Sequence, residues 1–409
     1  MSEILIIADD LSGAADCASA YAKAGMETVV VIDRDATQDA SARVIAIDAD
    51  SRRMPAAQAA QAHRDLHARH AAGVRLFYKK IDSTLRGNFA AELAAMVDAA
   101  GLAIVAPAFP KAGRTTVNGC QFLNGRPLEQ SEVWRAEGIE GAACIPAMLR
   151  RHGVRAALVT LAQLRQDGAG LAARLAALAR DGVQAVVCDA ETDDDLRIIA
   201  QASAQPPAPC FWVGSAGLAD HLAALARGAR PAAPEIEVAG AILAVVGSLS
   251  SVSREQAARL QEATRITQIT MPAGVLRQGR SHPQWARMRQ ALGTALAGGR
   301  DLLLTIGTEE PVDMEAGLQL SQALAAMVAP QSGSLGAIIA TGGETARALL
   351  SAMAYRGLRL VGEIEAGVPL AIASGPRPLP VITKAGAFGS RDTLLHCYQA
   401  LAQKRDGHP

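Results

Sequence analysis

The chain has 409 residues, half of them hydrophobic, and its 40 lysines and arginines balance 40 aspartates and glutamates. This length exceeds one ordinary core and predicts two domains, while the hydrophobic content excludes general disorder. The zero net charge gives no reason to expect nucleic acid or a membrane surface as a partner. An anionic ligand would therefore have to be bound by local geometry.

The N-terminal run MSEILIIADD has no positive segment and no cleavage-site pattern, so we expect a first strand rather than a signal peptide. No apolar stretch approaches the roughly 20 residues that a membrane-spanning helix needs. The six cysteines are scattered, with no CxxC pair, which is typical of reduced thiols in the cytoplasm.

Short β-branched apolar runs alternate along the chain with Ala/Leu-rich segments of helical periodicity. This alternation predicts an α/β fold of two domains, each a mostly parallel sheet flanked by helices, with a cleft between them. Strands are expected in the first half at 4–8, 27–32, 43–47, 75–79, 102–107, 156–161, 184–189 and 210–214. In the second half they are expected at 241–247, 266–271, 301–307, 337–342, 370–374 and 379–384.

The Pro- and Ala-rich stretch 227–240 has no periodicity and is the best candidate for a linker. It places the domain boundary near residue 232, which gives domains 1–231 and 232–409. Pro206–Pro207 is a weaker alternative, because a boundary there would move the unit that starts at Cys210 into the second domain.

Three loops that follow strands in the second half are rich in glycine or serine and open helices: 247–250, 342–345 and 384–389. Helix N-termini offer free N–H groups, and glycine lets an anion approach the backbone, so these loops favour the phosphates of a nucleotide. Thr341–Glu344 and Ser253–Gln256 also match the spacing of capping boxes, which would be purely structural. Neither a GxxxxGK[ST] loop nor a GxGxxG fingerprint after a strand is present.

The loops after strands in the first half are charged instead. They are Asp9–Asp10, Ser51–Arg53, Lys79–Gly87 and Pro110–Thr115. In open α/β sheets ligands bind beyond the carboxyl ends of strands, and cations with hydroxyls and carboxylates there favour a hydroxylated carboxylic acid as the ligand. A solvated turn with ion pairs is the structural alternative, and it applies to one of Lys79 and Lys80, because neighbouring strand residues face opposite ways.

Asp9 and Asp10 follow the first strand, and either Asp10 or Ser12 could serve only as a helix cap. As functional groups, the two carboxylates could bind Mg²⁺ or accept the proton of a substrate hydroxyl. We favour the functional interpretation.

Three histidines, His63, His67 and His70, follow helical spacing. Because no carboxylate or cysteine joins them in an HExxH-like arrangement, we expect them on a solvated helix face rather than at a metal.

Seven stretches carry a resemblance to a known family. They are IADDLSGAAD (7–16), KKIDSTLRGN (79–88), APAFPKAGRTTVNG (106–119), VGSAGLA (213–219), VVGSLSSVSREQ (245–256), IATGGETARAL (339–349) and ITKAGAFG (382–389). In their order and extent they resemble the four-carbon acid sugar kinases along nearly the whole chain.

The resemblance implies that domain 1–231 binds the sugar acid and domain 232–409 binds ATP with Mg²⁺. It implies transfer of the terminal phosphate to the C4 hydroxyl of D-threonate, with D-erythronate or a 3-oxo-tetronate as alternatives. It implies acid contacts at Asp10, Arg52, Lys80, Asp82 and Ser83, although Arg53 could fill the Arg52 position. It implies nucleotide contacts at Ser248, Gly342, Gly343, Glu344, Thr345 and Gly386.

Asp10 and Asp82 are the candidate catalytic groups. The lysine beside Asp82 should hold that carboxylate ionised, which favours Asp10 as the base that accepts the hydroxyl proton. The sequence does not identify ligands for Mg²⁺, and it leaves a homo-oligomer open. A hydroxy-acid oxidoreductase, which the missing dinucleotide fingerprint disfavours, and a non-catalytic sugar-acid sensor are the alternatives from other classes.

Overall fold

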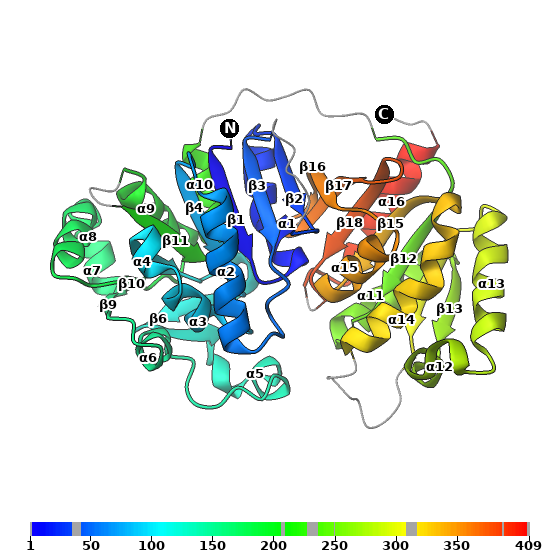
Figure 1. The fold of residues 1–409 in the computed structure, drawn as a ribbon, viewed down its shortest axis with the longest axis horizontal. Helices are drawn as coiled ribbons and strands as arrows, with labels where there is room; N and C mark the ends of the chain where they lie inside the picture. Colours follow the sequence, from blue (N-terminus) through cyan, green and yellow to red (C-terminus); the bar gives the residue numbers. More distant parts are fainter. Residues whose placement is uncertain are drawn as a thin grey trace. The chain divides into compact units, whose positions relative to one another are not determined.

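The computed structural model describes residues 2–34, 42–205, 209–226, 236–248, 250–307, 317–386 and 388–406. The chain forms two compact units, drawn as a ribbon in Figure 1. Unit 1 contains Met1–Thr28 and Gln38–Pro231, and unit 2 contains Val29–Thr37 and Ala232–Pro409. The sequence places all residues up to 231 in the first domain, but the segment from Val29 to Thr37 belongs to the second unit. Most of the predicted linker, and Pro206–Pro207, lie outside the described residues.

Unit 1 is built on a parallel sheet whose strands lie in the order β3-β1-β4-β11-β5-β10-β9. The strands are β1 (Ile4–Ala8), β3 (Val44–Asp48), β4 (Leu76–Lys80), β5 (Leu102–Ala106), β9 (Ala156–Val159), β10 (Ala185–Cys188) and β11 (Cys210–Gly214). Every residue of β1, β3 and β5 is buried, which agrees with the continuous apolar runs in the sequence. Each of these strands falls within one or two residues of its predicted position.

Helices pack on this sheet. Those of unit 1 are α1 (Leu11–Lys23), α2 (Ala56–His70), α3 (Phe89–Ala94), α4 (Val97–Ala100), α5 (Glu132–Ala136), α6 (Ile145–Arg151), α7 (Leu161–Gln166), α8 (Leu171–Arg180), α9 (Asp193–Ser203) and α10 (Ala216–Leu225). Helix α10 packs against both α1 and α9, whereas α2 packs against α3. Short 3₁₀ turns lie at Pro110–Ala112 and Leu128–Gln130.

A second, three-stranded antiparallel sheet of unit 1 was not predicted. It consists of β6 (Arg114–Val117), β7 (Cys120–Leu123) and β8 (Arg126–Pro127). Its strands are two to four residues long and only partly buried, so they lack the apolar run that identifies the other strands. Positive φ angles at Asn118 and Gly119 mark the tight turn between β6 and β7.

Unit 2 contains strands in the order β13-β14-β12-β15-β18-β17-β16-β2. They are β2 (Thr28–Val31), β12 (Ala241–Val246), β13 (Thr267–Met271), β14 (Leu302–Ile306), β15 (Leu335–Thr341), β16 (Gly357–Glu365), β17 (Val368–Ser374) and β18 (Leu379–Lys384). Pairing is parallel from β13 to β18 and antiparallel from there to β2. Strand β16 was not predicted, and β2, which the sequence places in the first domain, pairs with β16.

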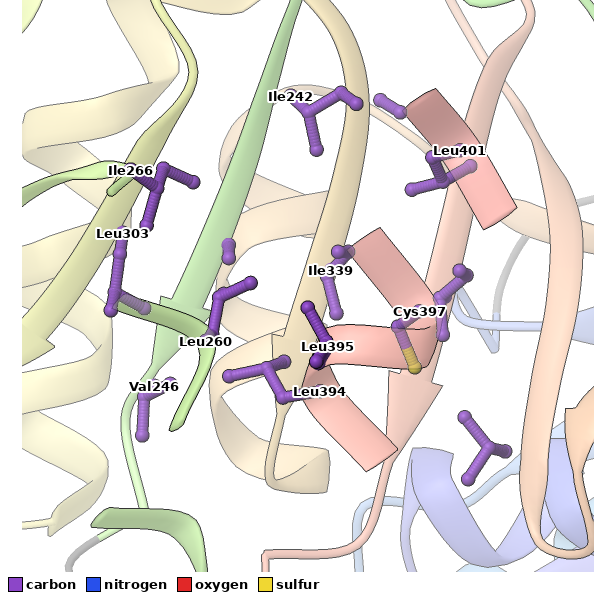
Figure 2. Close-up of a cluster of buried hydrophobic side chains, with 14 of the residues drawn as sticks. Ile242, Val246, Leu260, Ile266, Leu303, Ile339, Leu394, Leu395, Cys397 and Leu401 are labelled. Carbon is purple, nitrogen blue, oxygen red and sulfur yellow. The ribbon is translucent and has the colours of Figure 1, made fainter. Parts of the chain in front are cut away.

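The helices of unit 2 are α11 (Ser251–Thr264), α12 (Ala273–Gln278), α13 (Trp285–Ala297), α14 (Gly317–Val328), α15 (Gly343–Ala352) and α16 (Thr393–Arg405), with 3₁₀ turns at Gly279–Ser281 and Ala329–Ser334. Figure 2 shows part of its core, in which Leu260 of α11 and Leu401 of α16 belong to one buried cluster with Ile242 and Ile339 of the sheet. Each fully buried leucine contributes about 1.5–3 kcal/mol to folding. Packing in this core holds α11 against the sheet, and the loop that follows β12 leads directly into the N-terminus of α11.

The expected α/β class, with a mostly parallel sheet and flanking helices in each unit, is confirmed. Among the described residues no helix is both long and apolar enough to cross a membrane.

Candidate functional site

The charged loops of unit 1 meet because their strands are neighbours. Strand β1 pairs in register with β3 on one side and with β4 on the other, so Ala8, Asp48 and Lys80 end the three strands at the same level. Asp9 and Asp10 leave β1, and Arg52 follows β3 after a short turn. The structure therefore brings Asp10, Arg52 and Lys80 to one edge of the sheet, as the sequence predicts.

Arg52 is the centre of an ion-pair cluster at this edge. Its Nε donates to Oδ2 of Asp9 at 2.7 Å, and Nη1 and Nη2 donate to the two oxygens of Asp10 at 3.0 and 2.8 Å. Asp10 Oδ1 also accepts the N–H of Gly13 at 2.9 Å and caps α1. Asp10 thus fulfils its structural role as a cap and also lies in the cluster. Arg53, the alternative to Arg52, is exposed.

Lys80 lies beside Asp10 over the first turn of α1. A Cβ on Gly13 would be 2.7 Å from Asp10 Oδ1 and 2.8 Å from Lys80 Nζ, so the absence of a side chain at Gly13 makes room for both groups. Lys80 is buried, with 4% of the residue exposed, and its Nζ donates to the carbonyl oxygen of Ile81 at 2.9 Å. Among the described residues it has no carboxylate within ion-pair distance.

Asp82 is held by neighbours that follow it in the chain. Arg86 Nε and Nη2 donate to its two oxygens at 2.7 and 3.0 Å, and the Thr84 hydroxyl donates to Oδ2. Burial raises the pKa of Asp82, but Arg86, Arg52 and Thr84 outweigh burial and hold that pKa well below its usual range. The expectation that Asp82 stays ionised is consistent with this, although the cation responsible is Arg86 rather than Lys80. The backbone carbonyl of the next residue, Ser83, accepts a hydrogen bond from Gln121 of β7 at 2.8 Å.

Lys79 faces away from this edge and takes part in a fully buried network. Its Nζ lies 2.8 Å from Glu92 Oε2 of α3, and Oε1 accepts from Ser51 at 2.5 Å and lies 3.3 Å from His63 Nε2. All four side chains have no exposed surface. The prediction that His63 lies on a solvated helix face is therefore wrong, and burial lowers the pKa of this histidine. Ser51 and Lys79 directly precede Arg52 and Lys80 in the chain, so the buried network holds the backbone next to both site residues in place.

In unit 2 the three glycine- and serine-rich loops also meet, because β15 lies between β12 and β18. Ser250 caps α11, and the hydroxyls of Ser250 and Ser253 donate to Gly386 O at 3.2 and 2.5 Å. A Cβ on Gly386 would be 2.3 Å from Ser248 Oγ, so only glycine fits beside that hydroxyl. Leu249 and Ala387 of these loops lie outside the described residues.

Helix α15 begins without a side-chain cap. Gly342 is its N-cap, at φ +93°, and Gly343, Glu344 and Thr345 form the first turn. Thr345 Oγ1 instead lies 3.1 Å from Ser321 Oγ. The capping boxes anticipated at Thr341–Glu344 and Ser253–Gln256 are therefore not formed, since Ser250 is the cap of α11. A helix N-terminus without a side-chain cap presents backbone N–H groups and the positive end of the helix dipole, which favours an anion.

Lys384 ends β18 opposite Thr341, the last residue of β15, and is 1% exposed. Its Nζ donates to the carbonyl oxygens of Ala385 and Gly386 at 2.9 and 3.2 Å. Burial lowers the pKa of this ammonium to about 8. A buried cation beside two helix N-termini is an electrostatic environment that favours phosphate groups.

Sequence reasoning included Arg86 and Arg114 in the charged loops without giving either an individual role, and it did not consider Glu92. The spacing of four residues between Asp82 and Arg86 is a sequence signal for an ion pair. Glu92 is the one acid in the otherwise apolar helix α3, which is a signal for a buried charge. Among the described residues no group of three or more His, Cys, Asp and Glu side chains could hold a metal ion.

Comparisons with known proteins cover both halves of the chain. A sugar-binding N-terminal domain matches residues 4–222, and a nucleotide-binding C-terminal domain matches residues 243–394. The D-threonate kinase of Cupriavidus necator is 48% identical over 98% of both chains, and that of Bordetella bronchiseptica is 34% identical over 98% of both. A solved structure from Salmonella typhimurium, 24% identical, matches 98% of this chain and 100% of its own with a TM-score of 0.78, which shows the fold alone.

The two domain matches span the two structural units, and the similarity to the relatives extends over nearly the full length of each protein. These relatives and the motifs that carry the resemblance agree. The chain therefore belongs to the family of four-carbon acid sugar kinases.

Proposed function

We propose that the protein transfers the terminal phosphate of ATP to the C4 hydroxyl of D-threonate. The observation that carries this proposal is the 48% identity, over 98% of both chains, to a protein named D-threonate kinase. The geometry supports it, because one unit contains a cluster suited to a hydroxylated acid and the other contains a cluster suited to phosphates. D-erythronate and 3-oxo-tetronate are the substrates against which this choice must be tested.

In unit 1, Asp10 is the base that accepts the proton of the attacking hydroxyl, and Lys80 and Asp82 bind substrate oxygens together with the Ser83 segment. Arg52 orients Asp10 through two hydrogen bonds, so the carboxylate cannot rotate away from a bound hydroxyl. Asp82, strongly ionised and held by Arg86, is suited to accept hydrogen bonds from hydroxyls rather than to carry a proton.

In unit 2, the first turn of α15 binds the ATP phosphates through backbone N–H groups, and Ser248 and Gly386 contribute from the neighbouring loops. Lys384 neutralises part of their charge. We propose that Mg²⁺ enters with the nucleotide, as is usual for kinases. The metal supplies neutralisation of phosphate charge during transfer.

Incubation of the purified protein with Mg-ATP and a panel of D-threonate, D-erythronate and 3-oxo-tetronate tests this function directly. We expect ADP release with D-threonate and a phosphomonoester at O4 in phosphorus NMR. If every four-carbon acid fails while ATP still binds, the proposed reaction is wrong. If another acid has the highest kcat/KM, only the substrate assignment changes.

A pH dependence follows from Lys384. Its lowered pKa of about 8 means that the ammonium is charged below pH 8 and loses its proton as the pH rises through that value. We therefore expect KM for ATP to be constant below pH 8 and to rise above it, by up to about tenfold per pH unit. In Lys384→Gln, KM for ATP should be high at all pH values, without this rise, and KM for the acid should be unchanged.

Lys404→Gln is the matched control, since Lys404 is an exposed lysine in the last turn of α16 in the same unit. This variant should keep the wild-type pH profile. A Lys384→Gln enzyme that loses affinity for the acid but not for ATP would contradict the assignment of the nucleotide to unit 2.

A further inference from the structure

The cationic side chains near the unit 1 cluster differ in whether they are already hydrogen-bonded to a carboxylate of the protein. Arg52 bonds to Asp9 and Asp10 through all three of its nitrogens, and Arg86 bonds to Asp82 through two. In both guanidinium groups the edge formed by Nε and Nη2 is therefore already bonded to carboxylate oxygens. Lys80 lies beside Asp10, over the first turn of α1, where a substrate hydroxyl would have to meet the proposed base.

Arg114 differs from both arginines. Its Nη1 donates to the carbonyl of Ala112, and its Nε is buried without a hydrogen-bond partner. Within the described part of the chain, Arg114 makes no ion pair, and no hydrogen bond from its Nη2 is found. The edge formed by Nε and Nη2 is the one through which a guanidinium binds a carboxylate with two parallel hydrogen bonds.

The backbone holds Arg114 rigidly next to the cluster. Its N–H and C=O both bond to Phe109, and it pairs with Leu123 of β7 in the small sheet. The same sheet is joined to the Asp82–Ser83 turn by the hydrogen bond from Gln121 to Ser83 O. Burial lowers the pKa of Arg114, the Asp82 carboxylate opposes that shift and the Arg86 charge adds to it, so the guanidinium lies within electrostatic reach of the site.

A buried N–H without a partner costs free energy, and a cation that is partly removed from water without a counter-ion adds to that cost. Both costs disappear if a carboxylate from a ligand lies against the Nε and Nη2 edge. We infer that Arg114 binds the carboxylate of the acid substrate and thereby makes the site selective for acids over neutral polyols of the same length. This inference rests on the proposed function, because it takes a four-carbon acid as the ligand.

The test compares D-threonate with D-threonamide, which has the same hydroxyls but a neutral amide in place of the carboxylate. For Arg114→Gln we expect kcat/KM for D-threonate to fall about 10²-fold or more, mainly through KM. The kcat/KM for D-threonamide should change less than about threefold, and KM for ATP should be unchanged. Arg114→Lys, which keeps the charge but not the two parallel bonds, should lie between wild type and Arg114→Gln.

Arg126→Gln is the control, because Arg126 is an exposed arginine of β8 in the same small sheet and should leave all these constants unchanged. Equal losses for both substrates in Arg114→Gln, or no loss for either, would overturn the inference. Isothermal calorimetry of D-threonate binding to wild type and to Arg114→Lys gives a second readout that needs no turnover. If wild type binds the acid without phosphorylating it, the proposed reaction fails, and the loss of affinity in the variant still decides the role of Arg114.

Discussion

Replacement of Asp10 by asparagine should lower kcat by about 10²-fold or more, with only a modest change in KM for the acid. Asparagine keeps the oxygen that can accept the N–H of Gly13 and one bond from Arg52, so the helix cap and the cluster survive. It removes the carboxylate that we propose as the acceptor of the hydroxyl proton. The measurement is steady-state kinetics with saturating ATP, with the acid varied.

Asp82→Asn is the informative comparison, because Asp82 is the other candidate carboxylate. Its ionised form is already stabilised by Arg86, so this variant should mainly raise KM for the acid. Asp98→Asn, at an exposed residue of α4, controls for the loss of a charge in unit 1. An Asp10→Asn enzyme with near-wild-type kcat, together with an Asp82→Asn enzyme that loses it, would transfer the role of base to Asp82.

The sequence was sufficient to predict the parallel strands, because buried strands of an α/β sheet are continuous apolar runs. Strand β16 escaped prediction because Arg359, Glu363 and Glu365 interrupt its apolar residues, and much of it is only partly buried. The pairing of β2 with β16 brings together residues that are more than 300 positions apart. No local pattern reports such a contact.

The candidate site divides in the same way. Asp10, Arg52 and Lys80 could be placed together from the sequence, since each ends or follows β1 or one of the two strands beside it. The loop that contains Arg114 was expected among the charged loops, but the position of Arg114 itself was not predicted, because it depends on the small sheet and on the long-range bond from Gln121 to the Asp82–Ser83 turn. The buried state of His63 was missed because helical spacing does not show which face of α2 meets Glu92 of α3.

Breaking the buried ion pair beneath the site should have a large effect on stability. Lys79→Met leaves the Glu92 carboxylate without its cation in a fully buried position, and we expect a loss of about 3–5 kcal/mol in the free energy of unfolding. Glu92→Gln keeps the oxygen that accepts from Ser51 but leaves Lys79 unpaired, so it should also be strongly destabilising. The double variant removes both charges and should cost less than the sum, with a coupling of at least about 2 kcal/mol.

Unfolding of unit 1 must be measured separately, because a protein of two units need not unfold in one step. Of the three tryptophans, Trp134 and Trp212 lie in unit 1 and Trp285 in unit 2. In a Trp285→Phe background, fluorescence during urea unfolding therefore reports on unit 1 alone. If the loss of unfolding free energy in the double variant equals the sum of the losses in the two single variants, Lys79 and Glu92 do not stabilise each other.

The pH dependence of this stability gives an independent check on the same network. Burial raises the pKa of Glu92, but Lys79 and His63 outweigh it, so the folded-state pKa lies far below the unfolded value. A depressed carboxyl pKa stabilises the fold above the unfolded value of about 4.3, and this contribution is lost as the pH falls below that value. The lowered pKa of His63 acts in the same direction from about pH 6.5 downward, because the folded state resists the protonation that the unfolded chain accepts. Unit 1 of the wild type should therefore lose stability progressively from pH 6.5 to pH 4, and the Lys79→Met, Glu92→Gln variant should lose less below pH 4.5, since it has no Glu92 carboxylate to protonate.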